Sequence, residues 1–307
     1  MSRSRGSRSS RISRTDALLL GLAVAATSTS APLTREAAAP ALAIAFWRNA
    51  LSAGGLVPLA ARTRGGVASP DRRRAWLVTV AAGVLLGGHF AAWISSLSLT
   101  TVAASVTLVA TQPVWAAIIA RLWGARIRRA TWVGIGLALA GVVIAAGFDV
   151  GVSGRALRGD MLALAGGALA AGYVSVGAVA RRDLTTTEYT AGCYSVAAVT
   201  VLVAALLSGQ HLTGFDDRAA LCILGITLGP QLLGHSVFNR LLRTVGPMVV
   251  SVAILGEIVG ASVLAAWWFG QRPPLAILPA AVLIGGGVLL VVRNQGAESD
   301  EVEVVVG

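Results

Sequence analysis

The chain has 307 residues, of which 55% are apolar and only 13% are charged, whereas soluble domains carry about 25% charged residues. This composition excludes a soluble protein and indicates an integral membrane protein. The basic residues behind the formal charge of +11 are all arginines in short blocks between apolar spans, which excludes a nucleic-acid-binding surface. Cys193 and Cys222 both lie in apolar runs and are too few for a disulfide framework or a metal site.

Hydropathy predicts an all-α membrane protein with ten transmembrane helices in two sets of five. The first set covers residues 16–35, 39–61, 75–97, 101–123 and 131–148. The second set covers residues 161–180, 187–208, 219–238, 246–269 and 275–292. The connections between them are mostly short, which is typical of antiparallel helical bundles.

The two ends of the chain are polar and predict cytoplasmic tails. Residues 1–15 are rich in serine and arginine and predict a disordered basic tail, and residues 294–307 form an acidic tail. The first segment also resembles the start of a signal peptide, but ten spans require the following ALLLGLAVAA as part of a helix. With both ends inside, inner segments hold nineteen arginines and outer segments five, as the positive-inside rule predicts.

Arg48 is the first candidate functional residue along the chain. It lies about eight residues into the second span, which is roughly 12 Å deep at about 1.5 Å per residue. Two interpretations fit this position equally well. The guanidinium attracts an anionic substrate group or pairs with a carboxylate, or its long side chain reaches back to the membrane surface beside Trp47.

The third and fourth spans contain further polar residues within apolar surroundings. His89 lies mid-span with Trp93 one turn later; a histidine there relays protons or contacts substrate, or simply packs. Gln112 precedes Pro113, and a proline bends a helix, so this pair predicts either a cavity wall or an ordinary kink. Trp93 and Trp115 are candidates for lining a substrate path, although tryptophans more often anchor helices at membrane surfaces.

Glu257 is the most informative residue of the second half. It lies near the middle of the apolar stretch 246–270, where a charge costs at least about 2.5–3.5 kcal/mol. Ala253 and Gly260 lie at helical spacing from it, so this face of the helix is small. We expect Glu257 to exchange protons or to bind a cationic group. The alternative is a neutral carboxyl group that hydrogen-bonds a neighbouring helix.

An internal repeat appears when the chain is shifted by 146 residues. Gly88-His89 then falls on Gly234-His235, which makes His235 a further candidate, and Ser105 falls on Ser251. Because each half would contain five spans, an odd number, the second half enters the membrane inverted. Inverted repeats are typical of secondary transporters, whose sites lie at the midplane between the halves.

The sequence resembles the drug/metabolite transporter superfamily, in its ten-helix branch with two EamA repeats. The resemblance rests on PALAIAFWRNALSA from residue 40, SVTLVATQPVWAAIIARLWGARI from residue 105, GIGLALAGVVIAAG from residue 134 and the stretch 246–270 followed by AVLIGGGVLLV. It implies one repeat over residues 16–148 and another over 160–293. Many members carry a glutamate where Glu257 stands.

The sequence departs from this family pattern at three positions. Members often have a glutamate after the glycine that ends the fourth and ninth helices, where this chain has Ala125 and Gln271. Many members also have a proline after the ninth-helix glutamate, where this chain has Ile258. The acids at the helix ends are therefore not expected to be required for coupling here.

The sequence and the resemblance together predict a transporter rather than an enzyme, with no cofactor. We expect a multi-pass protein of the inner membrane that exports a small metabolite or drug-like molecule by alternating access, with coupling to protons. The alternatives are an intramembrane enzyme acting on a lipid, with Glu257 and His89 or His235 as its acid–base pair, and a non-transporting subunit or sensor. The sequence contains no nucleotide-hydrolysis motif.

Overall fold

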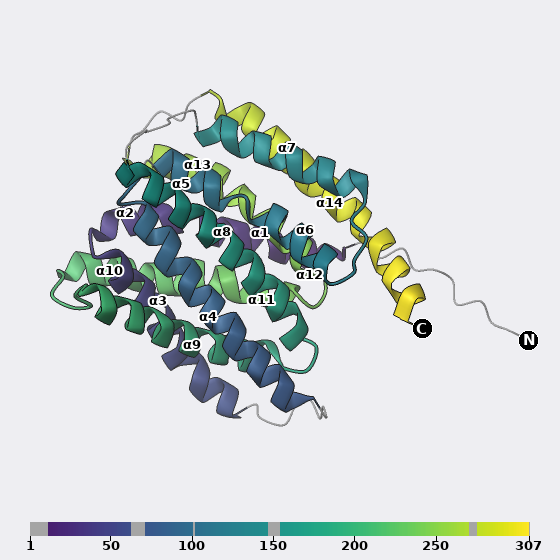
Figure 1. Ribbon diagram of the computed structural model, residues 1–307. Helices are drawn as coiled ribbons and strands as arrows, with labels where there is room; N and C mark the ends of the chain where they lie inside the picture. Colours follow the sequence, from purple (N-terminus) through teal and green to yellow (C-terminus); the bar gives the residue numbers. More distant parts are fainter. Residues whose placement is uncertain (1–11, 63–70, 101, 147–153, 270–274, 307) are drawn as a thin grey trace, which may run out of the picture.

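The computed structural model describes residues 12–62, 71–100, 102–146, 154–269 and 275–306, and these residues are helical with short turns between the helices (Figure 1). Nine helices in the described chain are long and apolar enough to span a membrane, and a shorter apolar helix covers Arg129–Ile144. The all-α fold with two five-span sets is therefore confirmed. The first eleven residues of the expected basic tail lie outside the described residues.

The helices of the first half begin close to the expected spans. They are α1 (Arg14–Ser28), α2 (Ser30–Ala37), α3 (Ala41–Arg62), α4 (Arg72–Ser96), α5 (Val102–Val109), α6 (Gln112–Leu122) and α7 (Arg129–Ala146). The first and fourth spans were expected to be single helices, but each is divided into two. In the first span, the hydroxyl groups of Ser28 and Thr29 bond backbone carbonyls of the preceding turn at the division.

The helices of the second half repeat this order with more interruptions. They are α8 (Gly154–Ala180), α9 (Thr186–Ser208), α10 (Asp217–Ile226), the π-helix η1 (Thr227–His235), α11 (Ser236–Leu241), α12 (Gly246–Ala253), the 3₁₀ turn η2 (Ile254–Gly256), α13 (Glu257–Phe269) and α14 (Ile277–Val306). The last helix continues past the expected end of the span at residue 292. The eighth and ninth spans are each built from three helical pieces.

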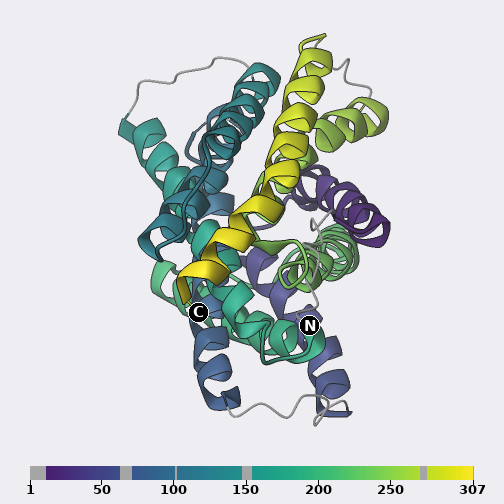
Figure 2. The same ribbon diagram turned by 90° about the vertical axis from the view of Figure 1, so that its right-hand side faces the viewer.

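Corresponding helices of the two halves pack against each other. α3 packs against α9 on one side of the bundle, and α7 packs against α14 on the opposite side. Figure 2 shows the teal and yellow helices of this second pair beside each other from another direction. Between these pairs lie α1, α4, α8 and the broken helices, and α4 contacts α8 extensively. The two halves are thus interleaved rather than joined as separate domains.

Arg181 fastens the connection between α8 and α9 to the end of α11. Its Nε donates to the Asn239 carbonyl at 3.1 Å, and its terminal nitrogens donate to the Leu184 carbonyl and the Thr186 hydroxyl. Burial, reinforced by the nearby positive charge of Arg243, lowers the pKa of Arg181 to about 10. The guanidinium therefore stays charged at neutral pH and holds three elements of the second half together.

Candidate functional site

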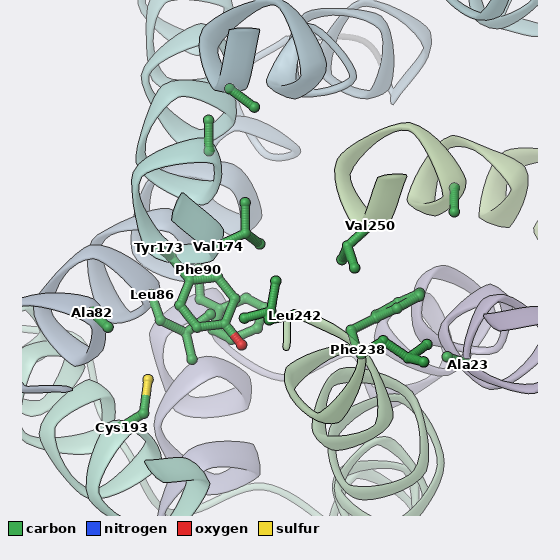
Figure 3. Close-up of a cluster of buried hydrophobic side chains, with 14 of the residues drawn as sticks. Ala23, Ala82, Leu86, Phe90, Tyr173, Val174, Cys193, Phe238, Leu242 and Val250 are labelled. Atoms are coloured by element: carbon green, nitrogen blue, oxygen red, sulfur yellow. The ribbon is translucent and has the colours of Figure 1, made fainter. Parts of the chain in front are cut away.

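A cavity lies where the two halves meet, with about 810 Å³ of empty space including its part open to solvent. Its wall comes from α1, α2, α4, α5 and α6 of the first half and from α8, η1, α11, η2 and α13 of the second. Figure 3 shows Phe90 and Tyr173 on one side of this region and Phe238 across from them. Of the residues expected to form a site, the wall includes Glu257, His89, Gln112, Trp93 and His235.

Two helix breaks border the cavity at corresponding positions of the repeat. The first lies at Ala110 and Thr111, between α5 and α6, and the second is η2, which ends at Gly256 before Glu257. The two positions differ by the 146-residue repeat shift. Broken helices whose ends point to a midplane site are typical of secondary transporters.

The first break has a local cause in Pro113. Proline lacks a backbone N–H, so the carbonyl of Val109, four residues earlier, loses its usual helical partner. α8 approaches this carbonyl closely at Gly167, where an added Cβ would stand only 2.8 Å from the Val109 oxygen. Only a glycine allows this approach, so the sequence of α8 accommodates the break in the neighbouring helix.

Glu257 begins α13 and faces α1. Its carboxyl group lines the cavity and lies beside the hydroxyl of Thr27. One turn later, Gly260 packs so tightly against Ser28 that a side chain there would collide with it. The small face expected around Glu257 is therefore the contact with α1, since small residues let two helix backbones approach.

Arg48 is buried at the edge of the cavity and does not reach a membrane surface. It is 1% exposed, its Nε donates to Gln231 Oε1 at 2.7 Å, and its guanidinium lies 4.1 Å above the ring centre of Phe90. Gln231 in turn donates to Asn49 Oδ1 at 3.0 Å. Phe90 lines the cavity and Arg48 does not, so the ring separates the charge from the cavity.

The two histidines lie in different surroundings although they occupy matching repeat positions. His89 Nδ1 is 2.9 Å from the Gly166 carbonyl oxygen, and its ring stacks on Trp93 with 5.9 Å between ring centres. His235 presents its ring edge-on to Phe90 and Phe238. His89 is thus hydrogen-bonded to α8, whereas His235 packs among aromatic rings.

Gln112 and Trp115 diverge although they are close in sequence. Gln112 is buried in the cavity wall, and its Nε2 donates to Ser251 Oγ at 3.2 Å, which joins α6 to α12. Trp115 does not line the cavity; its indole N–H donates to the Thr111 hydroxyl at 3.2 Å. This bond turns the ring along its own helix, so the structure does not place Trp115 with the other candidates.

Comparison with known proteins identifies the family. The model of the EamA-like transporter family matches residues 15–147 and 157–293, two copies that cover most of the chain. The chain belongs to the EamA-like transporter family. One similar solved structure, described only as "Crystal structure of protein", has a TM-score of 0.75 and 20% identity over 90% of this chain and 96% of that one. It supports the fold alone, and a search of curated proteins found no match.

This EamA-like protein is therefore a multi-pass membrane protein of a drug/metabolite transporter family. Its repeats explain why both halves contribute to one cavity. Within the described residues, no group of three or more His, Cys, Asp or Glu side chains is placed to hold a metal ion.

Sequence reasoning missed several polar residues of this EamA-like site. Gln231 and Asn49 form the network that holds Arg48. Tyr173 lines the cavity and its hydroxyl donates to the side-chain oxygen of Asn239. The signal for Gln231 was available, since an amide beside Pro230 in an apolar span resembles the Gln112–Pro113 pair in the first half.

Proposed function

We propose that this protein is a secondary transporter of the inner membrane that exports a small metabolite or drug-like molecule by alternating access, coupled to protons through Glu257. The observation that supports it most is the position of Glu257. This residue is the one carboxylate among the described residues that line the cavity, and it stands at a helix break within the second repeat. Acids within membrane spans are functional candidates by default because they are costly.

The interleaved repeats suggest how the cavity would change its access. α3 with α9 and α7 with α14 form the outer pairs, and the broken helices lie between them. A rocking motion of one set of helices against the other would open the cavity to each side in turn around a fixed site. The breaks beside Thr111 and Glu257 are the natural places for the helices to bend.

Glu257 is well placed to link this motion to proton movement. Its carboxyl lies beside Thr27 of α1, and α13 contacts α1 closely through Gly260. Whether the carboxyl is protonated decides whether a charge is present at this contact. The binding of substrate near this carboxyl would therefore depend on its protonation, which is the requirement for coupling.

A proteoliposome experiment tests the proposal. An imposed pH gradient is followed with a dye inside the vesicles while a panel of amino acids, organic acids and organic cations is added. We expect at least one compound to dissipate the gradient with the wild type, and Glu257→Gln to abolish this response. Glu36→Gln is the matched control, because Glu36 is paired with Arg218 away from the cavity.

Two outcomes would contradict the proposal. If Glu257→Gln dissipates the gradient as fast as the wild type, Glu257 does not couple transport to protons. If no compound dissipates the gradient, and none crosses the membrane in the absence of a gradient, the protein does not transport any compound of the panel and the transport proposal is refuted. The insertion and folding of each variant are checked by size-exclusion chromatography before the flux is compared.

A further inference from the structure

Two nitrogens of the Arg48 guanidinium are buried without a hydrogen-bond acceptor. Its Nη1 and Nη2 are buried and have no hydrogen-bond partner, while Nε is bonded to Gln231. No ion pair within 4 Å joins Arg48 to Glu257, and both lie in the described part of the chain. Two buried guanidinium nitrogens without an acceptor are costly, and stacking on Phe90 contributes only about 0.5–2 kcal/mol.

The cavity wall, which Phe90 joins to Arg48, also contains hydrogen-bond donors without acceptors. The indole nitrogen of Trp93 is buried without a partner, and an indole N–H can only donate. The hydroxyl of Ser30, which also lines the cavity, has no partner either. The unsatisfied groups are therefore mainly donors, and a ligand that satisfies them must bring acceptor oxygens.

The remaining wall fits an aromatic or otherwise flat apolar body. Phe90, Tyr173 and Phe238 all contribute rings to it. Phe90 lines the cavity and covers the guanidinium, so rotation of this one side chain would bring Arg48 into contact with a molecule in the cavity. A planar guanidinium matches a carboxylate through two parallel hydrogen bonds.

We propose that the molecule bound in the cavity is an organic carboxylate, whose anionic group is received by Arg48 and Trp93 and whose apolar body lies against the aromatic wall. This inference rests on the proposed transport function and specifies its substrate class. Four charged or titratable neighbours surround the guanidinium besides the ligand: Glu257, Tyr194, His89 and His235. Of these only Glu257 is a carboxyl group, and in its ionised form it competes with the ligand for the guanidinium.

The test uses three ligands of one shape and different charge: benzoate, benzamide and benzylamine. Binding to the purified full-length protein in detergent is measured by titration calorimetry, which needs neither flux nor a gradient. We expect benzoate to bind more tightly than the other two. Arg48→Gln should weaken benzoate binding by about 30-fold or more, because it removes the charged partner of a buried anion.

Three further variants keep the test decisive. Trp93→Phe retains the ring but removes the N–H, and should weaken benzoate binding by about fivefold. Arg62→Gln, at the exposed end of the same helix α3, is the matched control and should bind as the wild type does. If Arg48→Gln does not fold, Arg48→Lys keeps the charge but loses the paired geometry, and should weaken binding by about tenfold.

Several results would overturn the inference. Benzoate that binds wild type and Arg48→Gln equally would mean that water, not a ligand, satisfies the guanidinium. Tighter binding of benzamide or benzylamine, or no benzoate binding at all, would assign the cavity to another substrate class. Transport of a cation or neutral compound in vesicles would then leave the transport proposal standing. Benzoate binding without any flux would instead refute transport alone.

Discussion

The third span of each half shows how one sequence repeat yields two different local structures. In the first half this span is α4, an uninterrupted helix over Arg72–Ser96. In the second half, 146 residues later, it consists of α10, η1 and α11, with Pro230 inside the π-helix. π-helical segments are frequent at functional sites, and this one carries the residue that holds Arg48.

Because of this difference, the two halves contribute different residues to the site. Gln231 occupies the position that Leu85 has in the first half, and Arg48 of the first half corresponds to Tyr194 of the second. The π-helix directs Gln231 toward Arg48, while the Tyr194 hydroxyl donates to the backbone carbonyl of Gln231. The halves therefore supply complementary parts, a charge from one and its amide partner from the other.

Making the second half resemble the first at this point should have the largest effect. Gln231→Leu copies Leu85 and removes the one hydrogen-bond acceptor of the buried Arg48. We expect it to lower the free energy of unfolding by about 3 kcal/mol, since it leaves a buried charge without a partner. Equilibrium unfolding in mixed micelles measures this change.

A matched amide elsewhere serves as the control for Gln231→Leu. Gln210 accepts one hydrogen bond from the Leu42 backbone N–H at 3.3 Å and is only half-buried. Gln210→Leu should cost less than about 1 kcal/mol. Equal losses for the two variants would show that the amide partner of Arg48 has no special energetic role.

The packing of the two third spans differs as well, and predicts a second, smaller effect. An added Cβ at Gly83 of α4 would stand 2.8 Å from the Cys193 carbonyl oxygen on α9, whereas at Gly229, its repeat counterpart, the nearest atom is Thr29 Oγ1 at 3.4 Å. Gly83→Ala should therefore destabilise by about 2 kcal/mol, because overpacking moves a backbone. Gly229→Ala should change stability by less than about 0.5 kcal/mol, and thermal unfolding of both variants in detergent compares them.

The sequence predicted the fold well because hydropathy and the repeat are strong signals in a membrane protein. Bilayer thickness sets the length of each span, so the ten apolar stretches appear close to where they were expected. The positions of the breaks were harder to predict. η2 arises in ILG, which contains no proline, and the division at Thr29 depends on side-chain bonds within one turn.

The candidate site was predicted in outline rather than in its contacts. Glu257, His89 and Gln112 stand out as polar residues in apolar spans, and all three line the cavity. The contacts of Arg48 depend on η1, a π-helix that hydropathy does not reveal. Trp93 and Trp115 are both tryptophans in apolar spans, so the sequence does not separate them. The hydrogen bond from Trp115 to Thr111, which holds its ring away from the cavity, is visible only in the structure.

The two histidines offer the finest comparison between the halves. His89 is bonded to the Gly166 carbonyl and stacked on Trp93, whereas His235 has ring contacts with Phe90 and Phe238. His89→Ala should therefore lower the free energy of unfolding by about 1 kcal/mol more than His235→Ala, the contribution of one buried hydrogen bond. Thermal unfolding of both variants in the same detergent measures the difference. A larger loss from His235→Ala would mean that the aromatic cluster around the π-helix, rather than the bond between α4 and α8, holds this part of the cavity wall in place.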